Sequence, residues 1–193
     1  MATSLNPNDN APTITLIDKH GDVLLQLRKE GDRNARSLLV SSRVLSLAST
    51  VFEAMFNGNF AEGQDLSYVS PRAVPVPDDD PIIMELLCNI FHMQMSEVPD
   101  KLDMKSFADF AVLCDKYDCR EAIRFQAKVW VFGLISDPDA PNFEKLLFVT
   151  YVLDLPHEFR TVTLAIVRDR KTSIKVSVAT HGQDFIPLTL IGM

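Results

Sequence analysis

The first regular pattern in the chain is an alternation of apolar and polar residues from Thr13 to Arg28. Residues 13–18 read TITLID, a His20-Gly21 turn follows, and residues 22–28 read DVLLQLR. A period of two is typical of half-buried strands, and a short turn between two such runs predicts a β-hairpin. A third strand is predicted at the apolar run 37–41, SLLVS.

From Val44 to Phe56 the apolar residues recur at helical spacing, and Ser49 lies where the N-cap of a second helix is expected. The pattern therefore predicts two short helices in tandem. The next apolar stretch, AVPVP at residues 73–77, contains prolines that confine a strand to the edge of a sheet.

The acidic run 78–80, followed by Pro81, predicts the start of a longer helix. Aspartate is a common N-cap, proline fits the first turn, and negative charge is favourable at the positive end of the helix dipole. We expect one buried face, with Glu85 and Asn89 on the opposite side. The buried stripe is Ile82, Ile83, Leu86, Leu87, Ile90 and Phe91.

Helical spacing continues over residues 107–117 and 123–134, and after a linker at 135–141 a helical pair is predicted within 141–170. The alternation of Ile174, Val176 and Val178 and the apolar run 185–191 then leave three alternatives for residues 171–193. The segment forms a terminal hairpin, is a disordered tail, or becomes ordered only against a partner.

Composition narrows the class of protein. The chain has 193 residues, of which 47% are hydrophobic, which excludes wholesale disorder and fits one domain with an extension. Residues 1–100 carry 7 basic and 14 acidic side chains, and residues 101–193 carry 12 of each. Because phosphate backbones require clustered Lys and Arg, we expect no direct binding of nucleic acid.

The chain ends and the cysteines indicate an intracellular protein of the cytoplasm or nucleus. Residues 1–12 are polar, contain no basic residue and resemble no signal or transit peptide, so they are predicted to form a disordered tail. No apolar run is long enough for a membrane span. Three cysteines without a CxxC pair argue against a disulfide framework.

No pattern of reactive residues predicts catalysis, a cofactor or a metal. His20, His92, His157 and His181 lie in no acid–base motif, and the glycines form no phosphate-binding loop. Cys114 and Cys119 are better explained as small buried side chains than as metal ligands. Asp78, Asp79 and Asp80 lack the spacing of a calcium loop, and helix capping explains them. We therefore expect a protein that binds other proteins.

Four stretches together resemble the BTB/POZ domain. They are DVLLQL from Asp22, VSSRVLSLASTVFEAMF at 40–56, VPVPDDDPIIMELLCNIFH at 74–92 and FAVLCDKYDCREAI at 110–123. The short sequences DDDP and DKYDC are similar to those of BTB proteins from filamentous fungi. The chain departs from the family where Ser41-Ser42 replace a His-basic pair and Thr50 replaces a proline. The resemblance implies an α+β fold over residues 13–134, with a small mixed β-sheet flanked by a cluster of α-helices, and a helical extension at 141–170.

The resemblance also implies two protein-binding surfaces. Phe60, Ala61 and Glu62 stand where BTB domains that bind the cullin-three ubiquitin-ligase scaffold carry an apolar residue, any residue and Glu. The alternative is that Phe60 packs on its own domain and Glu62 is solvated. Ile14, Leu16 and Ile17 precede the sheet at the place of the family's homodimer interface, or they close their own sheet.

A third surface, the family's corepressor pocket, pairs an aspartate with a basic residue. Asp22 is present here, but Ser42 occupies the basic position and Arg43 comes one residue late, which rotates it by about 100° on a helix. The expected function is a non-enzymatic, oligomerising adaptor, including the role of substrate adaptor for a cullin-RING ubiquitin ligase. The alternative is a dimerising scaffold or indirect transcriptional regulator without a ubiquitin role.

Overall fold

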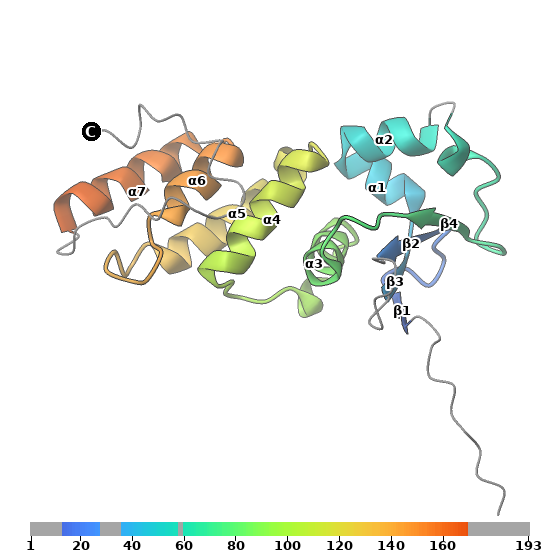
Figure 1. The fold of residues 1–193 in the computed structure, drawn as a ribbon, viewed down its shortest axis with the longest axis horizontal. Helices are drawn as coiled ribbons and strands as arrows, with labels where there is room; N and C mark the ends of the chain where they lie inside the picture. The colour runs from blue at the N-terminus through green and yellow to red at the C-terminus, as the bar shows by residue number, and fades with distance from the viewer. Residues whose placement is uncertain (1–12, 28–35, 58–59, 170–193) are drawn as a thin grey trace, which may run out of the picture.

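A computed structural model describes residues 13–27, 36–57 and 60–169 of the chain. These residues form a mixed α+β structure with a four-stranded sheet, seven α-helices and two short 3-10 helices. Figure 1 shows the elements spread along the long axis of the molecule, with the sheet and α1–α2 at one end and α6–α7 at the other. No helix within the described residues is both long and apolar enough to cross a membrane.

The sheet has the strand order β1-β3-β2-β4. Its strands are β1 (Thr13–Leu16), β2 (Val23–Leu27), β3 (Arg36–Val40) and β4 (Arg72–Pro75). β2 and β3 are antiparallel, whereas β1 runs parallel to β3 and β4 runs parallel to β2, so the sheet is mixed. The proline-containing strand β4 lies at an edge, as predicted.

The predicted hairpin between the first two strands is wrong. β3 lies between β1 and β2, and the backbone N–H groups of Ile17 and Asp18 both donate to the Leu39 carbonyl. A Cβ atom at Gly21 would lie 2.7 Å from the Val40 carbonyl oxygen. The turn at 18–21 therefore packs closely against the end of β3. After this turn the chain crosses β3 and forms β2 on its other side.

The two tandem helices are present as α1 (Ser42–Ala48) and α2 (Thr50–Asn57). The Ser49 hydroxyl accepts a hydrogen bond from the Phe52 N–H at 3.0 Å, which confirms its predicted capping role. Phe52 and Phe56 are buried beneath α2. A 3-10 helix, η1 (Ala61–Gly63), follows and precedes β4.

Helix α3 (Pro81–Phe91) begins as predicted, because Asp80 accepts from the N–H groups of Ile82 and Ile83. The predicted division of its faces is wrong at two positions: Ile82 is 65% exposed and Asn89 is buried. Eight of its eleven residues are buried. The helix packs against β3, α1, α4 and α5, so it is enclosed on several sides instead of one.

After a second 3-10 helix, η2 (Met95–Glu97), α4 (Met104–Lys116) and α5 (Arg120–Leu134) form the centre of the molecule. Their core is aromatic, since the rings of Phe107 and Phe110 pack nearly perpendicular to the Trp130 ring at centroid distances of 5.4 and 5.3 Å. The indole N–H of Trp130 donates to the Pro99 carbonyl at 2.9 Å. This bond fixes the loop before α4.

The predicted helical pair in 141–170 is present as α6 (Lys145–Val152) and α7 (Pro156–Asp169). α6 packs on both α4 and α7, and the hydrophobic core runs without interruption from Ile17 to Ala165. α6 therefore lies between α4 and α7. The predicted tails at 1–12 and 171–193 lie outside the described residues.

Candidate functional site

Three of the four stretches that carry the BTB resemblance meet around Tyr117, at the end of α4. The ring of Tyr117 stacks on Phe52 at 4.4 Å between centroids. Its carbonyl accepts a hydrogen bond from the Ser49 hydroxyl, and its own hydroxyl donates to Asp79 at 2.6 Å. These residues therefore join α2, the start of α3 and the end of α4.

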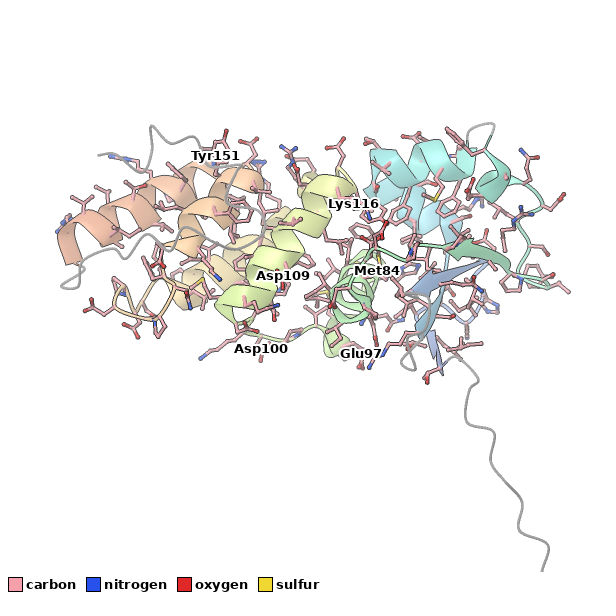
Figure 2. All side chains as sticks on the ribbon, in the orientation of Figure 1. Met84, Glu97, Asp100, Asp109, Lys116 and Tyr151 are labelled. Atoms are coloured by element: carbon pink, nitrogen blue, oxygen red, sulfur yellow. The ribbon has the colours of Figure 1, made fainter. Side chains whose placement is uncertain are left out.

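Asp79 has a structural role that capping does not explain. Its side chain is 3% exposed and accepts hydrogen bonds from the Lys116 ammonium and the Tyr117 hydroxyl, both at 2.6 Å. Burial raises the pKa of Tyr117, and its bond to the Asp79 carboxylate raises it further. Figure 2 shows Lys116 at the end of α4 nearest to α1 and α2. A buried carboxylate with two donors stabilises this junction.

Asp22 and Arg43, the two candidate pocket residues, form no bond with each other, in keeping with the one-residue shift of Arg43. Asp22 instead accepts from the Ser42 N–H at 2.7 Å and from the Ser42 hydroxyl at 2.6 Å, while Arg43 is exposed. The short side chain of Ser42 bonds to the carboxylate directly. The residues at this position link β2 to the start of α1.

His92 joins the end of α3 to the start of α1. Its Nδ1–H donates to the Cys88 carbonyl at 2.8 Å and its Nε2 accepts from the Ser41 N–H at 3.0 Å. A ring that donates with one nitrogen and accepts with the other is neutral. Burial lowers the pKa of His92, and this outweighs the bond to Cys88, which favours the protonated ring.

The three cysteines are free and buried. Burial raises the pKa of Cys88 and of Cys114 well above the ordinary value, which keeps both thiols protonated. Protonated, buried thiols are poor nucleophiles and poor metal ligands. Among the residues that the structure describes, no three His, Cys, Asp or Glu side chains are grouped so as to hold a metal ion.

The candidate cullin-binding residues lie on a tight turn directly after α2. Phe60 is 59% exposed, Ala61 is exposed and Glu62 is half-buried. Gly63 anchors the turn, because a Cβ atom there would lie only 2.4 Å from the Phe56 carbonyl oxygen. An aromatic ring is therefore presented to solvent two residues before a carboxylate, on a backbone that packs closely against α2.

The candidate dimer residues differ in their exposure to solvent. Ile14 and Leu16 on the edge strand β1 are 53% and 66% exposed, whereas Ile17 is 4% exposed and belongs to the protein's own core. Ile17 is thus a core residue, as the alternative interpretation has it. Its burial excludes it from an exposed surface.

Two further exposed apolar side chains lie on α1 and just after α3. Leu47 on α1 is 91% exposed, and Met93 just after α3 is 78% exposed. Met93 and Leu16 line a cleft of about 490 Å³ between β1, α1 and the end of α3. Leu47 looked like a core residue because it continues the apolar spacing of its helix, so spacing alone gave no signal of its exposure.

A second cleft, of about 400 Å³, lies between the α4–α5 junction and the end of α6. It is lined by Asp115, Arg120, Tyr151, Val152 and Asp154, and Figure 2 shows Tyr151 on α6. The Arg120 guanidinium donates to Asp115 at 2.8 Å, so the cation among these residues is already paired.

Comparison with known proteins adds no relative: no family model matches the chain, and no curated protein matches it.

Proposed function

We propose that the chain is a BTB/POZ module, a non-enzymatic protein–protein interaction domain that oligomerises and acts as an adaptor. The order of elements, with a small mixed sheet followed by helices, supports this proposal. So does the meeting of three of the matching stretches at Tyr117, because residues of one family motif are expected to contact one another.

The adaptor role extends to the cullin-three scaffold of ubiquitin ligases. The observation that carries it is the exposed ring of Phe60 beside Glu62 on an anchored turn. An exposed aromatic residue is a typical anchor for a partner's pocket, and a carboxylate next to it adds a charge-assisted hydrogen bond. Because the turn is tightly packed, little conformational freedom is lost on binding.

The test is the light-scattering mass of the full chain, alone and mixed with the N-terminal domain of a cullin-three scaffold. We expect a stoichiometric complex at micromolar concentration. Glu62→Lys should abolish it by placing a cation at the carboxylate's position, whereas Glu97→Lys, a charge reversal on the exposed 3-10 helix η2, should not. Absence of a complex with the unmodified chain overturns the cullin role and leaves the dimerising scaffold.

The dimerising scaffold is the second candidate, and a separate observation favours it. The exposed apolar residues Leu16 on β1 and Met93 just after α3 line the cleft of about 490 Å³, and Ile14 is exposed on the same edge strand as Leu16. An isologous dimer needs one such self-complementary patch on each copy. This role requires neither Phe60 nor Glu62.

A further inference from the structure

The segment between η1 and β4 contains a serine that is followed by a proline, Ser70-Pro71. No other serine or threonine in the sequence precedes a proline. Residues 64–71 connect the two elements without helix or strand. Figure 1 shows this connection at the end of the molecule that carries the sheet, away from α6 and α7. The dipeptide therefore lies on a loop and not in the packed core.

Side chains are exposed along the second half of this loop. Tyr68 is 71% exposed and Val69 is 77% exposed, and Ser70 and Pro71 are exposed as well. An exposed tyrosine and valine in sequence show that this part of the chain stands away from the rest of the fold. An enzyme can therefore reach the Ser70 side chain from solvent without unfolding the protein.

The Ser70 hydroxyl bonds to no other residue that the structure describes. Other serine hydroxyls are used in the fold: Ser49 caps α2, Ser42 donates to Asp22 and Ser106 donates to Asp103. A phosphate on any of these three would break a bond that stabilises the structure. Ser70 can accept a phosphate without such a loss.

The backbone between Gln64 and Arg72 is also held mainly at its ends. The Gln64 N–H donates to η1 at 3.2 Å, and the Arg72 N–H donates to the Asp22 carbonyl at 2.8 Å. Between these bonds, the Val69 N–H donates locally to the serine hydroxyl two residues earlier, at 3.2 Å. A segment without helical or ladder bonds can adopt the extended shape that peptide-binding grooves require, at little cost in stability.

A proline after the acceptor residue is a recognition feature with a physical basis. Proline carries no N–H. A groove that offers no acceptor at this position therefore binds proline without loss and rejects other residues, whose N–H would be left without a partner. Proline also favours an extended backbone at the residue before it. Ser70-Pro71 thus has the features that a proline-directed protein kinase selects.

A cation for the phosphate is present two residues after Ser70. Arg72 is partly exposed and makes no ion pair with another described residue. Two residues span at most about 7 Å of backbone, so the Arg72 guanidinium can reach a phosphate on Ser70. A guanidinium binds phosphate oxygens through paired N–H donors.

We propose that Ser70 is the phosphate acceptor for a proline-directed protein kinase, and that Arg72 pairs with the phosphate once it is attached. The Ser70 oxygen attacks the γ-phosphorus of ATP, the bond from that phosphorus to the bridging oxygen breaks, and ADP leaves. The hydroxyl proton passes to the base of the kinase. The product carries about two added negative charges. Because η1 packs on β4, this charge arises close to the turn that carries Glu62, although the modification does not depend on the cullin role.

The test is incubation of the full chain with MgATP and each of two proline-directed kinases, one cyclin-dependent and one mitogen-activated, followed by fragment mass spectrometry. We expect one phosphate, on Ser70. Pro71→Ala keeps the hydroxyl and should slow its phosphorylation at least about tenfold. Ser67→Ala, the matched control in the same loop, should be phosphorylated at the unmodified rate. Absence of phosphate on Ser70 with both kinases, or equal rates for Pro71→Ala and the unmodified chain, overturns the assignment of the acceptor.

Phosphorus nuclear magnetic resonance of the phosphorylated chain tests the pairing with Arg72. The second pKa of phosphoserine is about 6, and a neighbouring guanidinium lowers it because it favours the dianion. We expect the phosphate to titrate at a pH about half a unit lower than in the Arg72→Gln variant. Arg160→Gln, at an exposed arginine on α7, is the control and should titrate like the unmodified chain. Equal titration in the unmodified chain and Arg72→Gln overturns the pairing.

Discussion

Tyr117 shows how residues that look suited to chemistry are used for stability. A tyrosine, a lysine and an aspartate within bonding distance resemble a proton-transfer site, yet the Asp79 side chain is 3% exposed and lines neither of the two clefts described above. The lysine covers the carboxylate and the tyrosine stacks on Phe52. The junction is therefore held by hydrogen bonds that require these particular partners, and not by hydrophobic contacts alone.

Tyr117→Phe should destabilise the protein by about 1.5–3 kcal/mol, because a buried carboxylate loses one of its two donors. The measurement is the free energy of unfolding in urea. Tyr68→Phe, at an exposed tyrosine, is the control and should change it by less than about 0.5 kcal/mol. A Tyr117→Phe variant as stable as the unmodified protein contradicts a stabilising role for this bond.

His92 should make stability depend on pH. Its folded-state pKa lies below the ordinary value of 6.5, so below about pH 6.5 the unfolded chain binds more protons than the folded one. Stability should therefore fall as the pH is lowered from 6.5 toward the folded-state pKa, and His92 should add no pH dependence above that window.

Urea unfolding between about pH 7 and pH 5 measures this effect. His92→Gln keeps a carbonyl that accepts from Ser41 but cannot titrate, so its stability should depend less on pH than that of the unmodified chain. An equal dependence in both proteins, or a His92 ring resonance that titrates above 6.5 in nuclear magnetic resonance, contradicts the expectation.

At the scale of elements, three helices end in the same way without glycine. After α3, α4 and α6 the chain turns through a residue with positive φ, at Met93 (58°), Asp118 (44°) and Asp154 (50°). In each case the N–H of the next residue donates to the carbonyl five positions earlier, as Gln94 N–H does to Asn89. This is the Schellman pattern, whose turning residue is usually glycine.

Met93→Gly should stabilise the protein by roughly 1 kcal/mol, since a methionine in this backbone region is strained and glycine is not. The thermal unfolding midpoint should rise. Met95→Gly is the matched control, because Met95 lies in η2 without a positive φ, and its substitution should not raise the midpoint. A lower midpoint for Met93→Gly contradicts the strain.

Local signals in the sequence predicted single elements well, because a cap or an apolar period acts over one turn. Asp80 and Ser49 marked helix starts that the structure confirms. The turns at Met93 and Asp118 were missed, since no glycine announces them. The predicted strand pairing was also wrong, because β1 pairs with β3, which begins 20 residues after β1 ends. Local patterns do not show which distant strand will pair with β1.

The candidate surfaces were predictable only in part, for a related reason. Apolar spacing identifies a helix face but not what covers it, so Leu47 belonged to the apolar series of residues 44–56 although its side chain is 91% exposed. Asp79 was assigned to a helix start, and its partners Lys116 and Tyr117 lie 37 and 38 residues away. Contacts over such separations depend on the packing of whole elements.

At the scale of the whole molecule, the proposed dimer makes a direct prediction. Leu16→Asp should halve the light-scattering mass, because it places a charge in the centre of an apolar interface without changing the buried core. Val69→Asp, at a residue 77% exposed on the loop before β4, should retain the dimer mass. A monomer mass for the unmodified chain contradicts the dimer directly.

The two edges of the sheet differ in a way that limits how far the protein can assemble. At β4, Pro75 lies within the strand, and Pro71 and Pro77 flank it, so this edge lacks several of the donors that an added strand requires. At β1, the residues Thr13–Leu16 include no proline and no charge. A copy that pairs along β1 uses the one edge on each molecule that accepts a strand. Growth by edge pairing thus stops at two copies, and the sheet cannot propagate into a fibre.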